Sequence, residues 1–173
     1  MRLRPDSAYL TRRRSSLTSY LFLKLVHILC AVVVAGTGIG IAFFLFMANR
    51  AGNLQALAVT IRHVVLADWI FTTPAVTLQL VTGLLLMREL GYSFTSTWFL
   101  LVIALFIFIG CCWIPVVFIQ YRLRMLAAAA LATGVVDDRF KRLMQFWTVL
   151  GIPAFIAILV VFWLMVYKPF IIA

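Results

Sequence analysis

Four long runs of apolar residues dominate the chain, and short segments with polar and charged residues separate them. A helix needs about 20 apolar residues to cross the hydrocarbon core of a bilayer. Because lipid offers the backbone no hydrogen-bond partner, each run is predicted to be a transmembrane helix. The pattern therefore predicts an all-α membrane protein, a four-transmembrane-helix bundle with short loops. The helices are expected at about residues 20–47, 64–88, 97–124 and 146–168.

The composition excludes a soluble globular domain. Of 173 residues, 65% are apolar and only 12% are charged, whereas soluble domains have about 45–50% apolar and about 25% charged residues. A net charge of +10 could suit nucleic acid, but the basic residues flank the apolar runs. There they meet anionic lipid headgroups. The expected partner is the lipid bilayer, and no nucleic acid is expected.

Residues 1–19 are expected to form a basic tail ahead of a transmembrane domain at 20–173. The apolar run behind this tail is too long for the h-region of a signal peptide, which has about 7–15 residues, so we expect a retained helix. Eight basic residues lie on the side of the termini and seven on the other side, which leaves the orientation open. The tail contributes Arg2, Arg4, Arg12, Arg13 and Arg14.

The longest connection, between the third and fourth runs, is expected to be largely helical. Residues 122–132 are rich in alanine and leucine, which favour helix. Gly134 is a candidate C-cap, and Asp137 with Asp138 is expected to begin the next helix. The third helix is therefore predicted to extend beyond its apolar run and turn back.

A stripe of polar residues follows one face of the second run. At helical spacing its members lie within about a quarter-turn of one another, so this face is predicted to point into the bundle. Such a stripe suits a path for protons or ions, and it equally suits helices that pack through hydrogen bonds. Asp68 is expected to pair with Arg62 or another basic group, or to be hydrated. The stripe consists of Asp68, Thr72, Gln79, Thr82 and Gly83.

His27 lies inside the first run, where an imidazole needs a partner. It is either a packing residue hydrogen-bonded across the bundle or a ligand of a flat cofactor, which small neighbouring residues would admit. By depth, Gln79 and Met165 are expected near its level. His63 lies about 18 Å away along the membrane normal, so the two histidines cannot ligate one iron. The small residues on the side of His27 are Ala31, Ala35, Gly38 and Ala42.

Several motifs resemble those of known membrane families. Leu23–Ile28, which contains His27, is similar to the first helix of HemJ-type protoporphyrinogen oxidases and CopD-like copper-resistance proteins. Phe71–Ala75 resembles their second helix, and Val166–Phe170 resembles the end of their last one. Another resemblance covers the chain from residue 20 onward. It is to bacterial predicted integral membrane proteins, domain of unknown function 2269, through motifs at 67–71, 113–117 and 162–166.

The HemJ resemblance implies haem b inside the bundle, with His27 as an axial ligand. Gln79 is then the expected hydrogen-bond partner of the imidazole, and Met165 a candidate second ligand. The lysine that HemJ proteins carry after the tryptophan of helix three is missing, because Phe99 follows Trp98 here. This departure argues against the oxidase activity, and the methionine or histidine pairs expected for copper transport are also missing.

Two functional hypotheses follow. The first is a haem b-binding redox protein of the bacterial inner membrane. The alternative is a non-enzymatic membrane protein, a small transporter or an accessory subunit, in which His27 and the polar stripe serve packing. The sequence leaves protein partners open, a homo-oligomer among them.

Overall fold

The computed structural model describes the backbone of residues 7–168 and the side chains of residues 17–168. Within that part it is a bundle of four helices long and apolar enough to cross a membrane, with no β-strand. The predicted all-α bundle with short loops is confirmed. Its elements are α1 (Ser7–Arg50), α2 (Leu54–Ala67), the π-helix η1 (Asp68–Thr72), α3 (Thr73–Glu89), α4 (Thr97–Thr133) and α5 (Asp138–Tyr167). The segments α2, η1 and α3 form one continuous crossing.

The helices are longer than the apolar runs that predicted them. α1 begins at Ser7 rather than near residue 20, within the segment expected as a tail, although the side chains of the tail arginines lie outside the described part. The second crossing begins at Leu54 rather than near residue 64, because Asn53 caps it. The Asn53 Oδ1 accepts a hydrogen bond from the Ala56 N–H at 3.0 Å. Apolar runs mark where a helix meets hydrocarbon, whereas caps decide where it ends.

The connection between α4 and α5 follows the prediction. α4 continues past residue 124 to Thr133, and Gly134 ends it with a φ of 73° in the left-handed region that glycine tolerates. Asp137 caps α5, since its Oδ1 accepts a hydrogen bond from the Arg139 N–H at 2.8 Å. α5 therefore begins at Asp138 rather than near residue 146.

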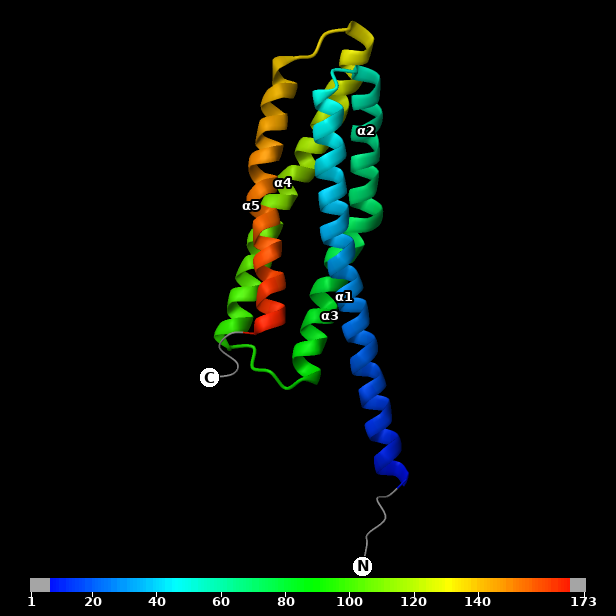
Figure 1. Ribbon diagram of the computed structural model, residues 1–173, viewed down its shortest axis with the longest axis vertical. Coiled ribbons are helices and arrows are strands. Elements are labelled where there is room, and N and C mark those ends of the chain that lie inside the picture. Colours follow the sequence, from blue (N-terminus) through cyan, green and yellow to red (C-terminus); the bar gives the residue numbers. More distant parts are fainter. Residues whose placement is uncertain (1–6, 169–173) are drawn as a thin grey trace, which may run out of the picture.

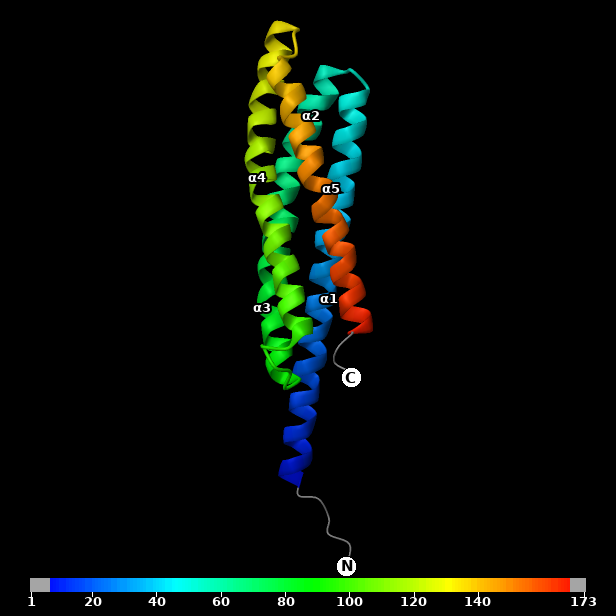
Figure 2. The same ribbon diagram turned by 90° about the vertical axis from the view of Figure 1, so that its left-hand side faces the viewer.

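The helices run along a common axis, and the first described residues of α1 lie at the same end as the last residues of α5 (Figures 1 and 2). α1 packs against α2 and α3, whereas α4 packs against α5 and α2. The apolar core fills the half of the bundle away from the termini and includes the fully buried Leu45, Ile61 and Leu123. At the opposite end, the Trp98 Nε1–H donates to the Leu164 carbonyl at 2.7 Å and ties α4 to α5.

Large apolar side chains cover the outside of the bundle. Phe22, Phe118 and Val166 are 64%, 65% and 77% exposed. In water such a surface would drive aggregation. Lipid chains are themselves apolar, so exposing these side chains to lipid has no such free-energy cost. The exposed surface is therefore the one that contacts the bilayer.

The second crossing changes its hydrogen-bond pattern near its middle. In η1 the Thr73 N–H donates to the Asp68 carbonyl, five residues back, and the Thr73 hydroxyl donates to the same carbonyl at 2.9 Å. Pro74 follows, and because proline has no N–H it cannot donate to the carbonyl of Ile70. Such π-helical turns occur frequently at functional sites. The hydrophobic pattern gave no sign of this one.

Candidate functional site

A cavity of about 590 Å³ lies near the terminal end of the bundle. It separates the pair α1 and α3 from the pair α4 and α5, which stand apart in this half of the bundle (Figure 1). Its wall is mostly apolar, and all four crossings contribute to it. The lining includes His27, Ala31, Gly83, Phe99, Phe106 and Met165. The cavity is thus an apolar chamber with an imidazole in its wall.

Both ring nitrogens of His27 have partners on α3. Nδ1 lies 2.9 Å from Thr82 Oγ1, and Nε2 lies 3.0 Å from Gln79 Nε2. The atom of Gln79 that faces the ring is the amide nitrogen, which can only donate, so His27 Nε2 accepts and the ring proton lies on Nδ1. Nδ1–H then donates to Thr82, whose hydroxyl donates in turn to the Leu78 carbonyl at 2.6 Å. This chain of donors fixes a neutral His27. Gln79 was expected at this depth, whereas the contact with Thr82 was not foreseen.

The imidazole of His27 also packs directly on the backbone of α3. A Cβ added at Gly83 would come within 3.1 Å of His27 Cε1. Because Gly83 has no side chain, the His27 ring can lie against the backbone of α3 at this position. The backbone of Gly83 itself keeps ordinary helical geometry. Gln79, Thr82 and Gly83 lie within little more than one turn of α3, and together they form the contact surface for the His27 ring.

Replacing Gly83 by alanine is expected to destabilise the protein by about 1–3 kcal/mol relative to Gly36→Ala, because both variants gain helix propensity but only the methyl group at position 83 meets the His27 ring. The free energy of unfolding in detergent measures this. Gly36→Ala is the matched control, since nothing lies within 4 Å of a Cβ at Gly36. Equal stability of the two variants would show that the His27 ring can move away from the added methyl group, which would contradict the prediction.

Two lysines line the same cavity together with two tyrosines. Lys24 Nζ lies 5.7 Å from the centre of the Tyr20 ring, and Lys168 Nζ lies 5.1 Å from the centre of the Tyr92 ring. Cation–π contacts of this kind hold an ammonium group over the ring face. Neither lysine forms an ion pair with a carboxylate among residues 17–168. Positive charge at the cavity is therefore not cancelled by the described side chains.

The structure brings some of the predicted site residues together and separates others. Met165 is half-buried on α5 and lines the same cavity as His27 and Gln79. His63 lines a different pocket between α1 and α2, of about 430 Å³. The sequence predicted from depth that the two histidines are far apart, and their placement in different pockets agrees with that prediction.

Only part of the row of small residues on α1 faces the cavity. Ala31 lines it, but Gly38 and Ala42 are exposed on the outside of the bundle. No atom lies within 4 Å of a Cβ built at Gly36, Gly38 or Gly40. Within this chain, no described helix therefore packs closely on these glycines.

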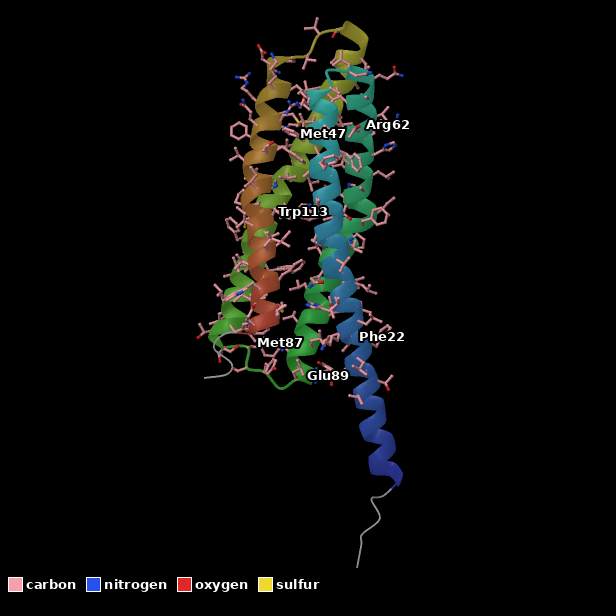
Figure 3. The ribbon with its side chains drawn as sticks, in the orientation of Figure 1. Phe22, Met47, Arg62, Met87, Glu89 and Trp113 are labelled. Atoms are coloured by element: carbon pink, nitrogen blue, oxygen red, sulfur yellow. The ribbon has the colours of Figure 1, made fainter. Side chains whose placement is uncertain are left out.

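A second polar group lies deeper in the bundle, around Asp68. Asp68 and Thr72 are 5% and 6% exposed, so their side chains face the interior as the stripe predicted. The expected pairing with Arg62 is not formed: Arg62 is exposed on α2 (Figure 3), and Asp68 has no ion pair among residues 17–168. The carboxyl group instead faces the side chains of Thr72, Trp113 and Gln120.

Trp113 and Gln120 of α4 were not predicted to join this group. Gln120 is only 2% exposed although it is polar and lies within an apolar run. It follows Trp113 by seven residues, two helical turns, which places both side chains on one face of α4. That spacing is the signal by which the sequence could have revealed them.

One family model matches the chain over residues 21–169, and its description is predicted integral membrane protein (DUF2269). The chain belongs to the DUF2269 family. The match includes all four crossings, His27, Asp68 and the residues around both. No curated protein and no solved structure matches the chain. DUF2269 membership therefore agrees with the multi-pass membrane bundle, and the chemistry of the site must be argued from its residues.

Proposed function

We propose that this protein binds haem b in the cavity beside His27 and acts as a redox protein of the bacterial inner membrane. The observation that carries the proposal is a neutral imidazole in the wall of a mostly apolar cavity of about 590 Å³ within a helix bundle. Haem is a flat apolar ring with two carboxylates at one edge, and iron in helix bundles is commonly held by histidine.

The residues around the cavity suit both parts of such a molecule. The apolar lining, with Phe99 and Phe106, suits the macrocycle. Lys24 and Lys168 have no carboxylate partner among the described residues, so they can pair with the two propionates. When bound, haem supplies one-electron chemistry that no amino-acid side chain here offers.

His27 can ligate iron through Nε2 and keep its other hydrogen bond. The Gln79 amide would have to release Nε2, while Nδ1–H remains on Thr82 at 2.9 Å. That bond fixes the tautomer and raises the basicity of the ligating nitrogen. The Gln79 Oε1 has no hydrogen-bond partner, so the amide is held on one side only. Met165, on the opposite helix pair, lines the same cavity and would be our candidate for a second ligand of the iron.

Visible absorption of the purified protein tests the proposal. Protein expressed with ample haem and purified in mild detergent is expected to show a Soret band, because the cofactor should remain in the cavity. A preparation without this band, which also fails to gain it when haem is added, would contradict haem binding. The alternative function would then lead.

The two lysines offer a separate test of how haem is held. The double variant Lys24→Gln with Lys168→Gln is expected to bind haem at least about tenfold more weakly, because each charge-assisted hydrogen bond contributes about 1.5–3 kcal/mol. Titration of haem into the apoprotein measures the Kd. Arg88→Gln is the control, since Arg88 is exposed and does not line the cavity. Unchanged affinity in the double variant would assign the propionates to other residues.

One observation favours the alternative, a non-enzymatic transporter or accessory subunit. Both nitrogens of His27 are hydrogen-bonded within the protein, which is the arrangement of a packing residue that joins α1 to α3. In that case the polar stripe holds helices together. The exposed Gly36 on the outside of α1 would be available to a second copy of the chain in a homo-oligomer. The absorption spectrum separates the two functions.

A further inference from the structure

Four polar side chains meet near the middle of the second crossing, away from the His27 cavity. Asp68 and Thr72 come from η1, four residues apart, and Trp113 and Gln120 come from α4, seven residues apart. Both spacings place a pair on one helix face. Trp113 lies nearer mid-height of the bundle than Arg62 does (Figure 3). We refer to Asp68, Thr72, Trp113 and Gln120 as the Asp68 cluster.

The Asp68 cluster contains buried polar atoms without partners. Among the described residues, six buried side-chain atoms lack a hydrogen-bond partner, and four of them belong to this cluster. They are Asp68 Oδ2, Thr72 Oγ1, Gln120 Oε1 and Trp113 Nε1. Buried polar groups are normally paired, so unpartnered groups gathered at one place indicate a missing component. Three of the four atoms are oxygens, and the Trp113 N–H and the Thr72 hydroxyl are the donors among them, so no positive charge in the cluster faces the carboxylate.

No cationic side chain supplies that charge within the described part of the chain. The titratable groups on the helices around η1 include Cys30 on α1, Arg62 and His63 on α2, and Cys111, Cys112 and Tyr121 on α4. Arg62 and His63 are exposed, and the Tyr121 hydroxyl accepts a hydrogen bond from Trp69 Nε1–H. None of these groups forms an ion pair with Asp68. An isolated carboxylate at this depth must be neutralised in another way.

We propose that the Asp68 cluster is a binding site for one small cation, H⁺ or Na⁺, carried on the Asp68 carboxylate. Bound as a proton, the cation makes Oδ2 a donor, and Gln120 Oε1 or Thr72 Oγ1 accepts from it. Bound as Na⁺, it takes these three oxygens as ligands, a donor set that suits a hard cation. In either case Trp113 Nε1–H, which has no partner without the cation, would donate to the carboxyl group that it faces. The site is independent of haem, because it shares no residue with the His27 cavity.

The π-helix gives the proposal a structural basis. η1 begins at Asp68 and ends at Thr72, so both cluster residues of the second crossing lie at the turn where its regular pattern is interrupted. Two residues stabilise that turn. The Thr73 hydroxyl donates to the Asp68 carbonyl, and Pro74 has no N–H with which to form the regular α-helical hydrogen bond to Ile70. Single π-helical turns within α-helices occur frequently at functional sites, and here the buried side of the turn carries Asp68 and Thr72.

The test uses the full chain, purified in detergent, and two measurements. Infrared spectroscopy detects the C=O stretch of a protonated carboxylic acid at a pH where ordinary aspartates are ionised. Thermal unfolding in NaCl is compared with unfolding in choline chloride at equal ionic strength. Asp68→Asn is the test variant, and Asp138→Asn is the matched control, because Asp138 is 82% exposed and pairs with Lys141 at 3.0 Å.

We expect one of two positive results. A protonated-acid band that Asp68→Asn removes and Asp138→Asn retains identifies a bound proton. A melting temperature that rises with Na⁺ in the wild-type protein and in Asp138→Asn, but not in Asp68→Asn, identifies bound Na⁺. Gln120→Leu gives a second check if Asp68→Asn fails to fold, since it should shift the acid band or weaken the Na⁺ effect. A wild-type protein with neither an acid band nor a Na⁺ effect would overturn the proposal.

Discussion

Replacing His27 by alanine is expected to abolish the Soret band of the purified protein while the four helices remain. The proposed ligand is the only histidine that lines the cavity within the described part of the chain. Without it, haem would keep only apolar contacts, the lysine pairs and Met165. Absorption spectroscopy reports the loss, and far-UV circular dichroism reports whether the helices survive.

His63→Ala is the matched control for this experiment, because it makes the same chemical change in a different pocket. Its spectrum is expected to equal that of the wild-type protein. If His27→Ala retained the Soret band, His27 would not be the ligand. If both variants lost it, the effect would be general destabilisation, which circular dichroism and thermal unfolding would reveal.

Replacing Trp98 by alanine is expected to destabilise the protein by about 3–5 kcal/mol, the usual cost of truncating a buried aromatic residue. The Trp98 side chain is 5% exposed and packs with Met87 and Leu164. Its Nε1–H also donates to the Leu164 carbonyl at 2.7 Å. The variant therefore loses the packing that joins α4 to α5 beside the cavity. Unfolding by titration with a denaturing detergent measures the change.

Trp163→Ala controls for the loss of an indole as such, because Trp163 is 51% exposed on the outside of α5. It is expected to change stability by less than about 1 kcal/mol. Because Trp98 also lines the cavity, its replacement is expected to weaken haem retention too. Equal stability of the two variants would mean that the cluster of Met87, Trp98 and Leu164 does not hold the helix ends together.

The polar stripe of the second crossing contributes side chains to two separate sites. Gln79, Thr82 and Gly83 form the contact surface for the His27 ring of α1, whereas Asp68 and Thr72 face α4. From the sequence this stripe was one feature with two interpretations, packing or conduction. In the structure the part beside His27 makes hydrogen bonds within the protein and leaves only Gln79 Oε1 without a partner, whereas Asp68 Oδ2 and Thr72 Oγ1 both lack partners. The two interpretations can therefore both apply, each to a different half.

The sequence by itself determined the architecture. Lipid forces every long apolar run to satisfy its backbone internally, so four runs gave four helices without knowledge of their contacts. Local chemistry also determined the turn after α4, since Gly134 tolerates a left-handed φ and Asp137 caps α5. Depth along a helix follows from residue number at a fixed rise. For this reason His27, Gln79 and Met165 could be expected at one level and His63 at another.

The tertiary structure alone decided which side chains meet. Periodicity shows the face on which a residue lies but not the helix opposite, because four apolar helices can pack in several orders. Only the packing of the second crossing on α4 brings Trp113 and Gln120 to Asp68 in place of Arg62. Likewise, the cavity beside His27 exists because the pair α1 and α3 stands apart from α4 and α5, a consequence of helix packing over long sequence separations.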